Sequence, residues 1–266
     1  MLANRVAQGA RTIAGRRAAM ARPQLVKPVS AVAVMERPTT VSTAAEVHLV
    51  DEMLPLRTVA LGPEASFFSR DEEGEAQGGW SAQFPEELAE TLDERKQDQP
   101  GVWYLALSAA KGADAHKEEW FLAYEDGVKA WGSDVNPELD AILESDRAIE
   151  RVFFGPKDAY IAQSTDGGLY WDNLPKDMDE CLEELLEKHG GLEWAAMGPD
   201  GEWFLLAEDG EFWYDGLHPA LDKALKEDKY GDLLRVRLGH DGFFLAQFEE
   251  ATVWRANREF TDYMLA

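Results

Sequence analysis

An internal repeat fills the chain from residue 56 onward and constrains the fold more than any other feature. A short hydrophobic run that ends in a turn residue occurs five times, and we take that turn residue as the anchor of each unit. The anchors are Gly62, Ser108, Gly155, Gly198 and Gly239, which lie 46, 47, 43 and 41 residues apart. This period predicts one supersecondary unit per repeat, each stacked on its neighbours.

Each unit begins with two predicted strands. The residues one and three positions before each anchor are apolar, which indicates a strand with one buried face. Aromatic residues followed by aliphatic residues predict a second strand after the anchor. These aromatic positions are Phe67-Phe68, Trp120-Phe121, Tyr160-Ile161, Trp203-Phe204 and Phe243-Phe244.

A hairpin and a third strand follow the second strand. Asp126-Gly127, Asp166-Gly167 and Asp209-Gly210 are strong hairpin signals, because both residues tolerate a positive φ. Glu73-Gly74 in the first unit and Glu249-Glu250 in the last stand at this point, so we expect those two turns to be built differently. The third strands carry the aromatic residues Trp80, Trp131, Trp171, Tyr214 and Trp254. We expect Trp131, Trp171 and Trp254 to pack in the core rather than to stack on sugars.

A short helix closes each unit. Pro85, Pro137, Pro175 and Pro219 stand where the first helical position accepts proline. Apolar pairs four residues apart predict one buried helical face in every unit. The pairs are Leu88/Leu92, Leu139/Leu143, Met178/Leu182, Leu221/Leu225 and Phe260/Met264. Gly190-Gly191 and Gly231 are predicted stops before the next unit.

The run from Gly198 to Leu217 resembles a β-propeller blade, most nearly the tectonin-type blade, in its glycine turn, aromatic strand, Asp-Gly turn and final aromatic strand. With the repeat, the resemblance implies a mainly β fold with short helices: a five-bladed propeller-like ring of strand-strand-strand-helix repeats. The helix after each third strand, in place of an outer strand, departs from the tectonin-type pattern. Proteins of the tectonin type are generally ligand-binding or scaffolding modules that often recognise glycans or lipid-like surfaces. We expect a closed ring in which residues 47–50 add an edge strand to the last blade.

The resulting domain prediction has two parts. Residues 1–46 form a basic presequence or disordered segment, and residues 47–266 form the five-repeat domain. The predicted repeats cover about 56–100, 101–147, 148–190, 191–231 and 232–266.

Charge separates the first part from the second. The chain has a formal net charge of −25, but residues 1–49 carry +5, which leaves −30 on the rest. Leu2, Val6, Ile13 and Met20 share one helical stripe opposite Arg11 and Arg22, a pattern typical of an organellar targeting presequence. A basic arm that stays on the mature protein and touches an acidic partner is the alternative. We favour a mitochondrial over a plastid address, because the first serine, Ser30, comes late.

Motifs for chemistry are scarce. Cys181 is the single cysteine, and His48, His116, His189, His218 and His240 stand at unrelated points of the unit. We therefore predict no catalytic, cofactor-binding or metal-ligating residue and no cofactor, and the motifs favour a protein that is not an enzyme. The negative charge argues against nucleic acid as a ligand of the body, and no apolar run reaches the length of a transmembrane helix. No oligomeric state is predicted.

Two acidic clusters bear on function. Asp177, Asp179, Glu180, Glu183, Glu184 and Glu187 cover one predicted helix face, and Glu86, Glu87, Glu90, Asp93 and Glu94 cover another. They are interpreted as solvated faces or, in a sharper hypothesis, as a docking surface for a basic protein partner.

The first functional hypothesis is a non-enzymatic interaction or scaffold module, or an accessory subunit of an organellar complex, that acts through this acidic surface. The alternative is a ligand- or carbohydrate-binding propeller, in one version active on glycosides, with its site at the central channel. Polar residues unique to one unit and directed into the channel would favour the alternative.

Overall fold

The computed structural model describes residues 46–54, 56–63, 66–71, 79–81, 84–95, 100–108, 119–227 and 229–265. The predicted presequence lies outside the described residues except for Glu46, as do His116 and the Glu73-Gly74 turn. No helix in the described ranges is long and apolar enough to cross a membrane.

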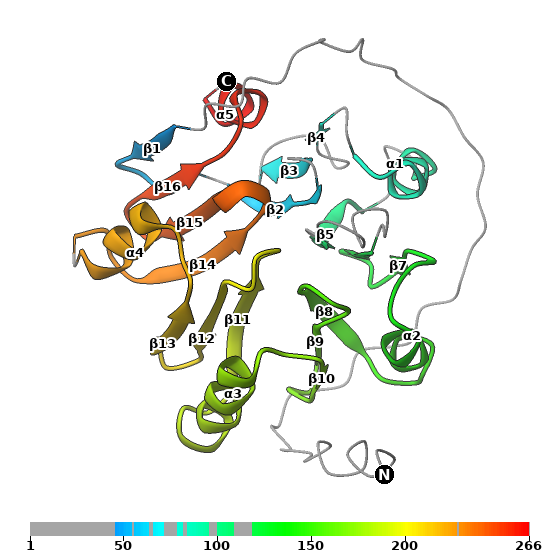
Figure 1. Ribbon diagram of the computed structural model, residues 1–266. Helices are drawn as coiled ribbons and strands as arrows, with labels where there is room; N and C mark the ends of the chain where they lie inside the picture. The colour runs from blue at the N-terminus through cyan, green and yellow to red at the C-terminus, as the bar shows by residue number, and fades with distance from the viewer. Residues whose placement is uncertain are drawn as a thin grey trace.

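Five antiparallel sheets follow one another along the chain, and each is a meander of three consecutive strands. The meanders are β2 (Leu56–Leu61), β3 (Phe67–Asp71) and β4 (Gly79–Trp80); β5 (Val102–Leu107), β6 (Trp120–Tyr124) and β7 (Lys129–Trp131); β8 (Ile149–Phe154), β9 (Tyr160–Ser164) and β10 (Leu169–Asp172); β11 (Leu192–Met197), β12 (Trp203–Ala207) and β13 (Phe212–Asp215); and β14 (Leu233–Leu238), β15 (Phe244–Phe248) and β16 (Thr252–Arg255). The sheets surround a common centre, and the first strand of each lies nearest to it (Figure 1). We call β2, β5, β8, β11 and β14 the inner strands.

Each inner strand contacts the next one along the chain, and β14 also contacts β2. A register shift occurs at the same place in all five, between the residues six and four positions before the anchor. The shifted pairs are Leu56/Thr58, Val102/Tyr104, Ile149/Arg151, Leu192/Trp194 and Leu233/Arg235. Such a bulge bends a strand and strengthens its twist. Its recurrence confirms the structural repeat, and the fold is propeller-like.

The strand β1 (Val47–Val50) pairs antiparallel with β16 and makes the last sheet four-stranded. This pairing confirms the edge strand predicted for residues 47–50. Segments from the two ends of the body therefore lie side by side in one sheet.

A helix follows each meander on the outside of the molecule (Figure 1). The helices are α1 (Glu86–Asp93), α2 (Pro137–Leu143), α3 (Lys176–Lys188), α4 (Pro219–Lys226) and α5 (Arg258–Met264). Pro137 and Pro219 are the first helical residues as predicted, whereas Pro85 and Pro175 stand one position earlier, at the N-cap.

The predicted apolar helix pairs are buried in four helices. In α4 the prediction was wrong in one residue: Leu221 and Ala224 are buried, and Leu225 is half-buried. Gly190 follows the cap of α3 with φ +89°, as expected of a left-handed stop, but Gly231 is separated from the end of α4 by several residues and does not cap it.

The prediction of one buried face for the first strands was also wrong. Residues 58–61 of β2 and 194–197 of β11 are buried without alternation. The last three residues of each inner strand are buried on both faces because the strand packs between two neighbouring sheets. The residue two positions before each anchor is therefore buried in all five strands, and these five residues line the candidate site.

Candidate functional site

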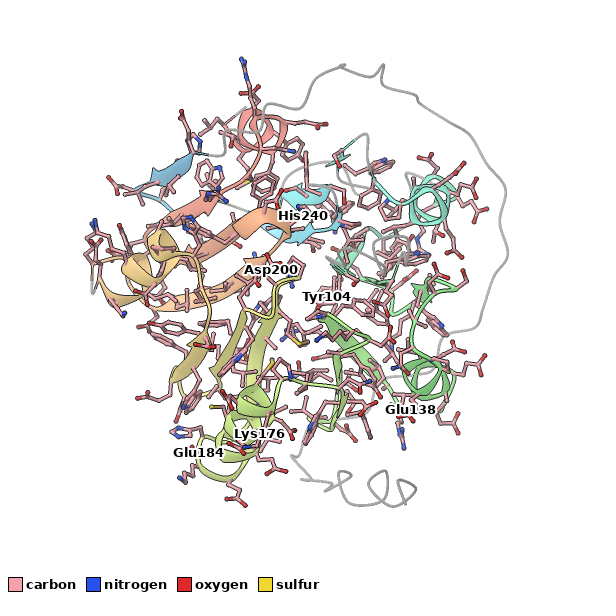
Figure 2. All side chains as sticks on the ribbon, in the orientation of Figure 1. Tyr104, Glu138, Lys176, Glu184, Asp200 and His240 are labelled. Carbon is pink, nitrogen blue, oxygen red and sulfur yellow. The ribbon has the colours of Figure 1, made fainter. Side chains whose placement is uncertain are left out.

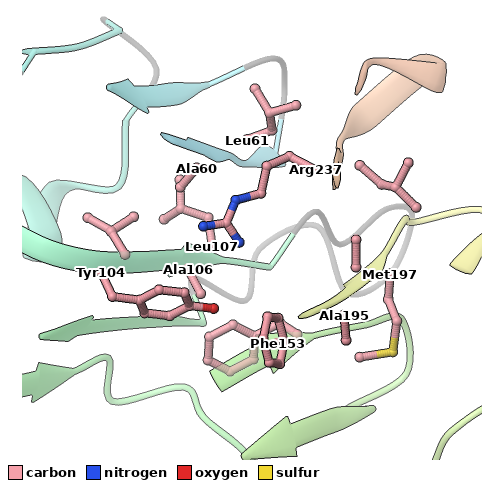
Figure 3. A pocket seen from close by; sticks show the side chains of 13 residues that line it. Ala60, Leu61, Tyr104, Ala106, Leu107, Phe153, Ala195, Met197 and Arg237 are labelled. Carbon is pink, nitrogen blue, oxygen red and sulfur yellow. The ribbon is translucent and has the colours of Figure 1, made fainter. Parts of the chain in front are cut away.

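The five inner strands enclose a small cavity at the centre of the molecule. It has a volume of about 30 Å³. Its lining is Ala60, Leu61, Tyr104, Leu105, Ala106, Leu107, Phe153, Phe154, Ala195, Ala196, Met197, Arg237 and Leu238. Figure 3 shows the guanidinium of Arg237 directed toward the ring of Tyr104 across this space. The lining thus contains one cation and one phenol among apolar side chains.

Side chains four positions before the anchor join each inner strand to the next one. In four of the five units this side chain donates a hydrogen bond to a backbone carbonyl of the following inner strand. The bonds are Thr58 Oγ1 to Trp103 O (2.7 Å), Tyr104 hydroxyl to Val152 O (2.7 Å), Arg151 Nη1 to Glu193 O (3.0 Å) and Trp194 Nε1 to Val236 O (2.7 Å). The Tyr104 and Trp194 bonds are buried, the Thr58 bond is partly buried and the Arg151 bond is exposed. Because a buried carbonyl without a donor is costly, the buried bonds in particular hold neighbouring sheets in place.

Arg237 differs from its counterparts two positions before the other anchors, which are Ala60, Ala106, Phe153 and Ala196. Only 8% of Arg237 is exposed. Its guanidinium carbon lies 4.1 Å from the centroid of the Trp194 ring and 5.4 Å from that of the Tyr104 ring. Among the residues that the structure describes, its buried Nε has no hydrogen-bond partner. The centre of the protein therefore holds a largely buried cation that stacks on aromatic rings.

The electrostatics around Arg237 disfavour its charge. Burial lowers the pKa of Arg237, an effect that Tyr104 opposes and the neighbouring Arg151 reinforces. Burial also raises the pKa of Tyr104, and Arg237 opposes that shift. Among the described residues, no carboxylate forms an ion pair with Arg237. Chemically, this arrangement is suited to hold an anion.

Among the residues that the structure describes, the cavity lining contains no carboxylate, histidine, cysteine or lysine, and its one phenol, Tyr104, has a pKa raised by burial. The described ranges also contain no group of three His, Cys, Asp or Glu side chains that could hold a metal ion.

The aspartates of the Asp-Gly turns act in turn formation. The Oδ1 atoms of Asp126, Asp166 and Asp209 accept from the backbone N–H two residues further on, at 3.2, 3.3 and 3.1 Å. The following glycines, Gly127, Gly167 and Gly210, have φ values of 81°, 84° and 90°. The predicted structural role of these pairs is confirmed.

The aromatic residues of the third strands dock on the helices. Four of the five donate a hydrogen bond to a polar side chain of the helix that follows. The bonds are Trp131 Nε1 to Asp140 (2.9 Å), Trp171 Nε1 to Asp179 (2.8 Å), Tyr214 hydroxyl to Asp222 (2.9 Å) and Trp254 Nε1 to Thr261 (3.4 Å). These contacts support the core role predicted for Trp131, Trp171 and Trp254, and they explain some of the acids in the first helical turns.

The described histidines lie apart from one another. His48 stacks on Trp254 at 5.3 Å, His189 contacts Asp209, and His240 contacts Asp241. His218 is the N-cap of α4, where its Nδ1 accepts from the N–H of Ala220 at 3.2 Å.

Cys181 is partly buried on α3. Burial raises the pKa of its thiol, and the carboxylates of Glu184, Asp177 and Glu180 reinforce the shift. These surroundings disfavour a reactive thiolate, in line with the predicted packing role.

The two acidic clusters lie on the outer helices. In Figure 2, Glu138 and Glu184 lie at the periphery, whereas Tyr104 lies near the centre. On α3, Asp177, Glu183 and Glu187 are exposed, and Glu180 and Glu184 pair with Lys176 and Lys188 on the same helix. The clusters are not gathered into one pocket with Arg237.

Arg237 was not singled out by the sequence analysis. The signal that could have found it is positional: at the site two residues before the anchor, three units carry alanine and one carries arginine. Because this strand was expected to expose one face to solvent, the pattern gave no reason to place Arg237 in the interior.

Comparisons with known proteins identify no family. No family model matches the sequence, and no curated protein matches it. Among solved structures, virginiamycin B lyase from Staphylococcus aureus is 12% identical, with 77% of this chain and 68% of that chain covered and a TM-score of 0.25. A streptogramin B lyase is 10% identical over 76% of this chain and 65% of that one, with a TM-score of 0.26.

A third solved structure is described as YCF48 bound to a D1 peptide. It is 9% identical and covers 82% of this chain and 99% of that chain, with a TM-score of 0.32. At these values the similarities carry no argument about function, and the propeller-like description rests on the strand pairing of this chain. The resemblance to tectonin-type blades stays a prediction.

Proposed function

We propose that the protein is a five-bladed propeller that serves as a non-enzymatic interaction module, an accessory subunit of an organellar complex that binds a basic protein partner through its acidic helices. The observation that carries the proposal is that α3 has one buried apolar face and one exposed acidic face. Met178, Leu182 and Leu185 are buried against the body, while Asp177, Glu183 and Glu187 face outward.

Two contacts support the ring in this proposal. The inner strand β14 contacts β2, and β1 from the start of the body pairs with β16 near its end. A body held together in this way presents its outer helices on a rigid support.

The charge of the helices supports a basic partner. Asp177, Glu183 and Glu187 form no ion pair within the described part of the chain. Exposed carboxylates without an ion pair add little to the stability of the fold, but they give a partner with lysine or arginine at matching positions electrostatic steering and specificity. The body charge of −30 favours the same kind of partner.

Affinity isolation from the protein's own cells tests the proposal. We would compare the tagged wild type with a D177N/E183Q/E187Q variant and with a matched control, E211Q/D215N/E250Q, which removes three exposed carboxylates elsewhere. The expected result is a co-isolated basic protein with the wild type and the control and its loss with the α3 variant. Recovery of the wild type alone, at its monomer mass, would overturn the proposal.

The alternative, a carbohydrate site at the central channel, lacks support. A cavity of about 30 Å³ has room for water-sized groups and not for a sugar ring. Glycoside hydrolysis needs two carboxyl groups, and the described lining has none. Arg237 instead favours a small anionic ligand as a second candidate function.

A further inference from the structure

Arg237 presents an unbalanced charge in the protein interior. It is 8% exposed, its Nε is buried without a hydrogen-bond partner, and no carboxylate of the described residues pairs with it. Burying an ion without a counter-charge is unfavourable by several kcal/mol. The contacts with the Trp194 and Tyr104 rings offset a part of this.

A second arginine adds to the imbalance. Arg151 on β8 lies 5.6 Å from the Trp194 ring, on which Arg237 also stacks, and it reinforces the lowering of the Arg237 pKa. Arg151 has a carboxylate, Glu193, at 4.0 Å, but that side chain is about half exposed. Two cations thus converge on one indole while the nearest paired acid faces solvent.

The available donor and the available space specify the chemistry of the missing partner. The Tyr104 hydroxyl donates to Val152 and is also hydrogen-bonded to the Arg237 guanidinium, which has no negatively charged partner among the described residues. The cavity beside it, of about 30 Å³, admits one or two water-sized groups. One positive charge is balanced by one negative charge, which favours a monovalent anion.

We propose that the central cavity binds a small monovalent anion, either a halide or a carboxylate of formate size, through the guanidinium of Arg237. The anion would compensate the buried guanidinium and tie the inner strands β5, β11 and β14, which supply Tyr104, Trp194 and Arg237, to a common centre.

Thermal unfolding at equal ionic strength tests the site. We would use sodium chloride, sodium formate and sodium gluconate, the last because its anion is too large for the cavity. Chloride is expected to raise the Tm of the wild type by about 3 °C over gluconate. An equal effect of formate indicates that the site accepts a carboxylate, and no effect of formate indicates a halide site.

Two variants localise the effect. R237M replaces the cation with an apolar side chain of similar length and is expected to abolish the difference between chloride and gluconate. R258M is the control: Arg258 is exposed on α5 and pairs with Asp262, so the difference should persist. Equal Tm values of the wild type in chloride and gluconate, or an undiminished chloride effect in R237M, would overturn the proposal.

A measurement on the wild type guards against a variant that fails to fold. Crystals grown in bromide are expected to show an anomalous peak within hydrogen-bond distance of the Arg237 guanidinium. The absence of this peak at full bromide exchange would contradict halide binding. Formate density at the same place in crystals grown in formate would then support binding of a carboxylate instead. The D177N/E183Q/E187Q variant should keep the anion response, which separates this site from the acidic surface.

Discussion

The hydroxyl of Thr58 on β2 donates a 2.7 Å hydrogen bond to the backbone carbonyl of Trp103 on β5. The two residues belong to neighbouring sheets, and Thr58 is 1% exposed. A single side chain four positions before the anchor thus ties one sheet to the next. The same device recurs with tyrosine, arginine and tryptophan in the following units.

We expect T58V to lower the free energy of unfolding by about 1–2 kcal/mol, because valine keeps the shape of threonine but leaves a buried carbonyl without its donor. Urea unfolding measures the change. The control is T165V at an exposed threonine, which should stay within about 0.5 kcal/mol of the wild type. Equal stabilities of T58V and the control would show that the bond between sheets contributes nothing.

The second prediction concerns the contact between a third strand and its helix. D179A on α3 removes the acceptor of the Trp171 indole and should cost about 1–2 kcal/mol. D177A, two residues earlier on the same helix, removes the same charge from an exposed position and should cost less than about 0.5 kcal/mol. Denaturant unfolding distinguishes them, and a larger loss in D177A would refute the assigned role of Asp179.

The repeat was readable from the sequence because turns and apolar periods depend on local chemistry. The Asp166-Gly167 turn, the buried pair Met178/Leu182 and the strand at Val47–Val50 all appear as predicted. Burial of the inner strands on both faces depends on the neighbouring sheets, which a local sequence pattern does not reveal. The alternation around Val236 is typical of a strand with one exposed face, so it did not indicate that Arg237 is buried. The central cation could be recognised only once five strands distant in sequence were brought together.

The third prediction isolates backbone strain. Gly167 has φ +84°, and a Cβ at this position would meet nothing within 4 Å. G167A should therefore lose about 1 kcal/mol through the left-handed backbone alone, and G167N should lose less because asparagine tolerates this region. Thermal or urea unfolding provides the comparison. A G167A protein as stable as the wild type would mean that the turn relaxes without cost.

A histidine cap gives the fourth prediction, which concerns pH. His218 accepts from the N–H of Ala220 through Nδ1, and burial, followed by the charge of Arg255, lowers its pKa from 6.5. The folded state favours the neutral imidazole, so this stabilisation is present above pH 6.5 and is lost as the pH falls through the lowered pKa.

H218N tests this dependence, because asparagine caps α2 and α5 at the same position and does not titrate. We expect its stability near pH 7 to match the wild type and its decline toward pH 5 to be shallower. H218A should lose about 1 kcal/mol near pH 7, and its deficit relative to the wild type should shrink toward pH 5, where protonation removes the histidine cap as well. Parallel pH profiles of the wild type and H218N would show that protonation of His218 does not destabilise the cap.

The last prediction tests the start of the folded body. A chain that begins at Glu46 retains β1, whereas one that begins at Asp51 lacks it and uncovers the hydrogen-bonding edge of β16. The longer chain should unfold at a higher temperature, because deletion also removes His48 from the Trp254 ring, 5.3 Å away. The shorter chain should self-associate with rising concentration in sedimentation velocity, since an unpaired edge can pair with a strand of another molecule.

The L49A variant distinguishes the backbone pairing of β1 from the contribution of its side chains. Leu49 is 46% exposed, so this variant should stay monomeric and lose less than about 1 kcal/mol. If the two truncated chains proved equally stable and equally monomeric, β1 would not be an integral part of the last sheet.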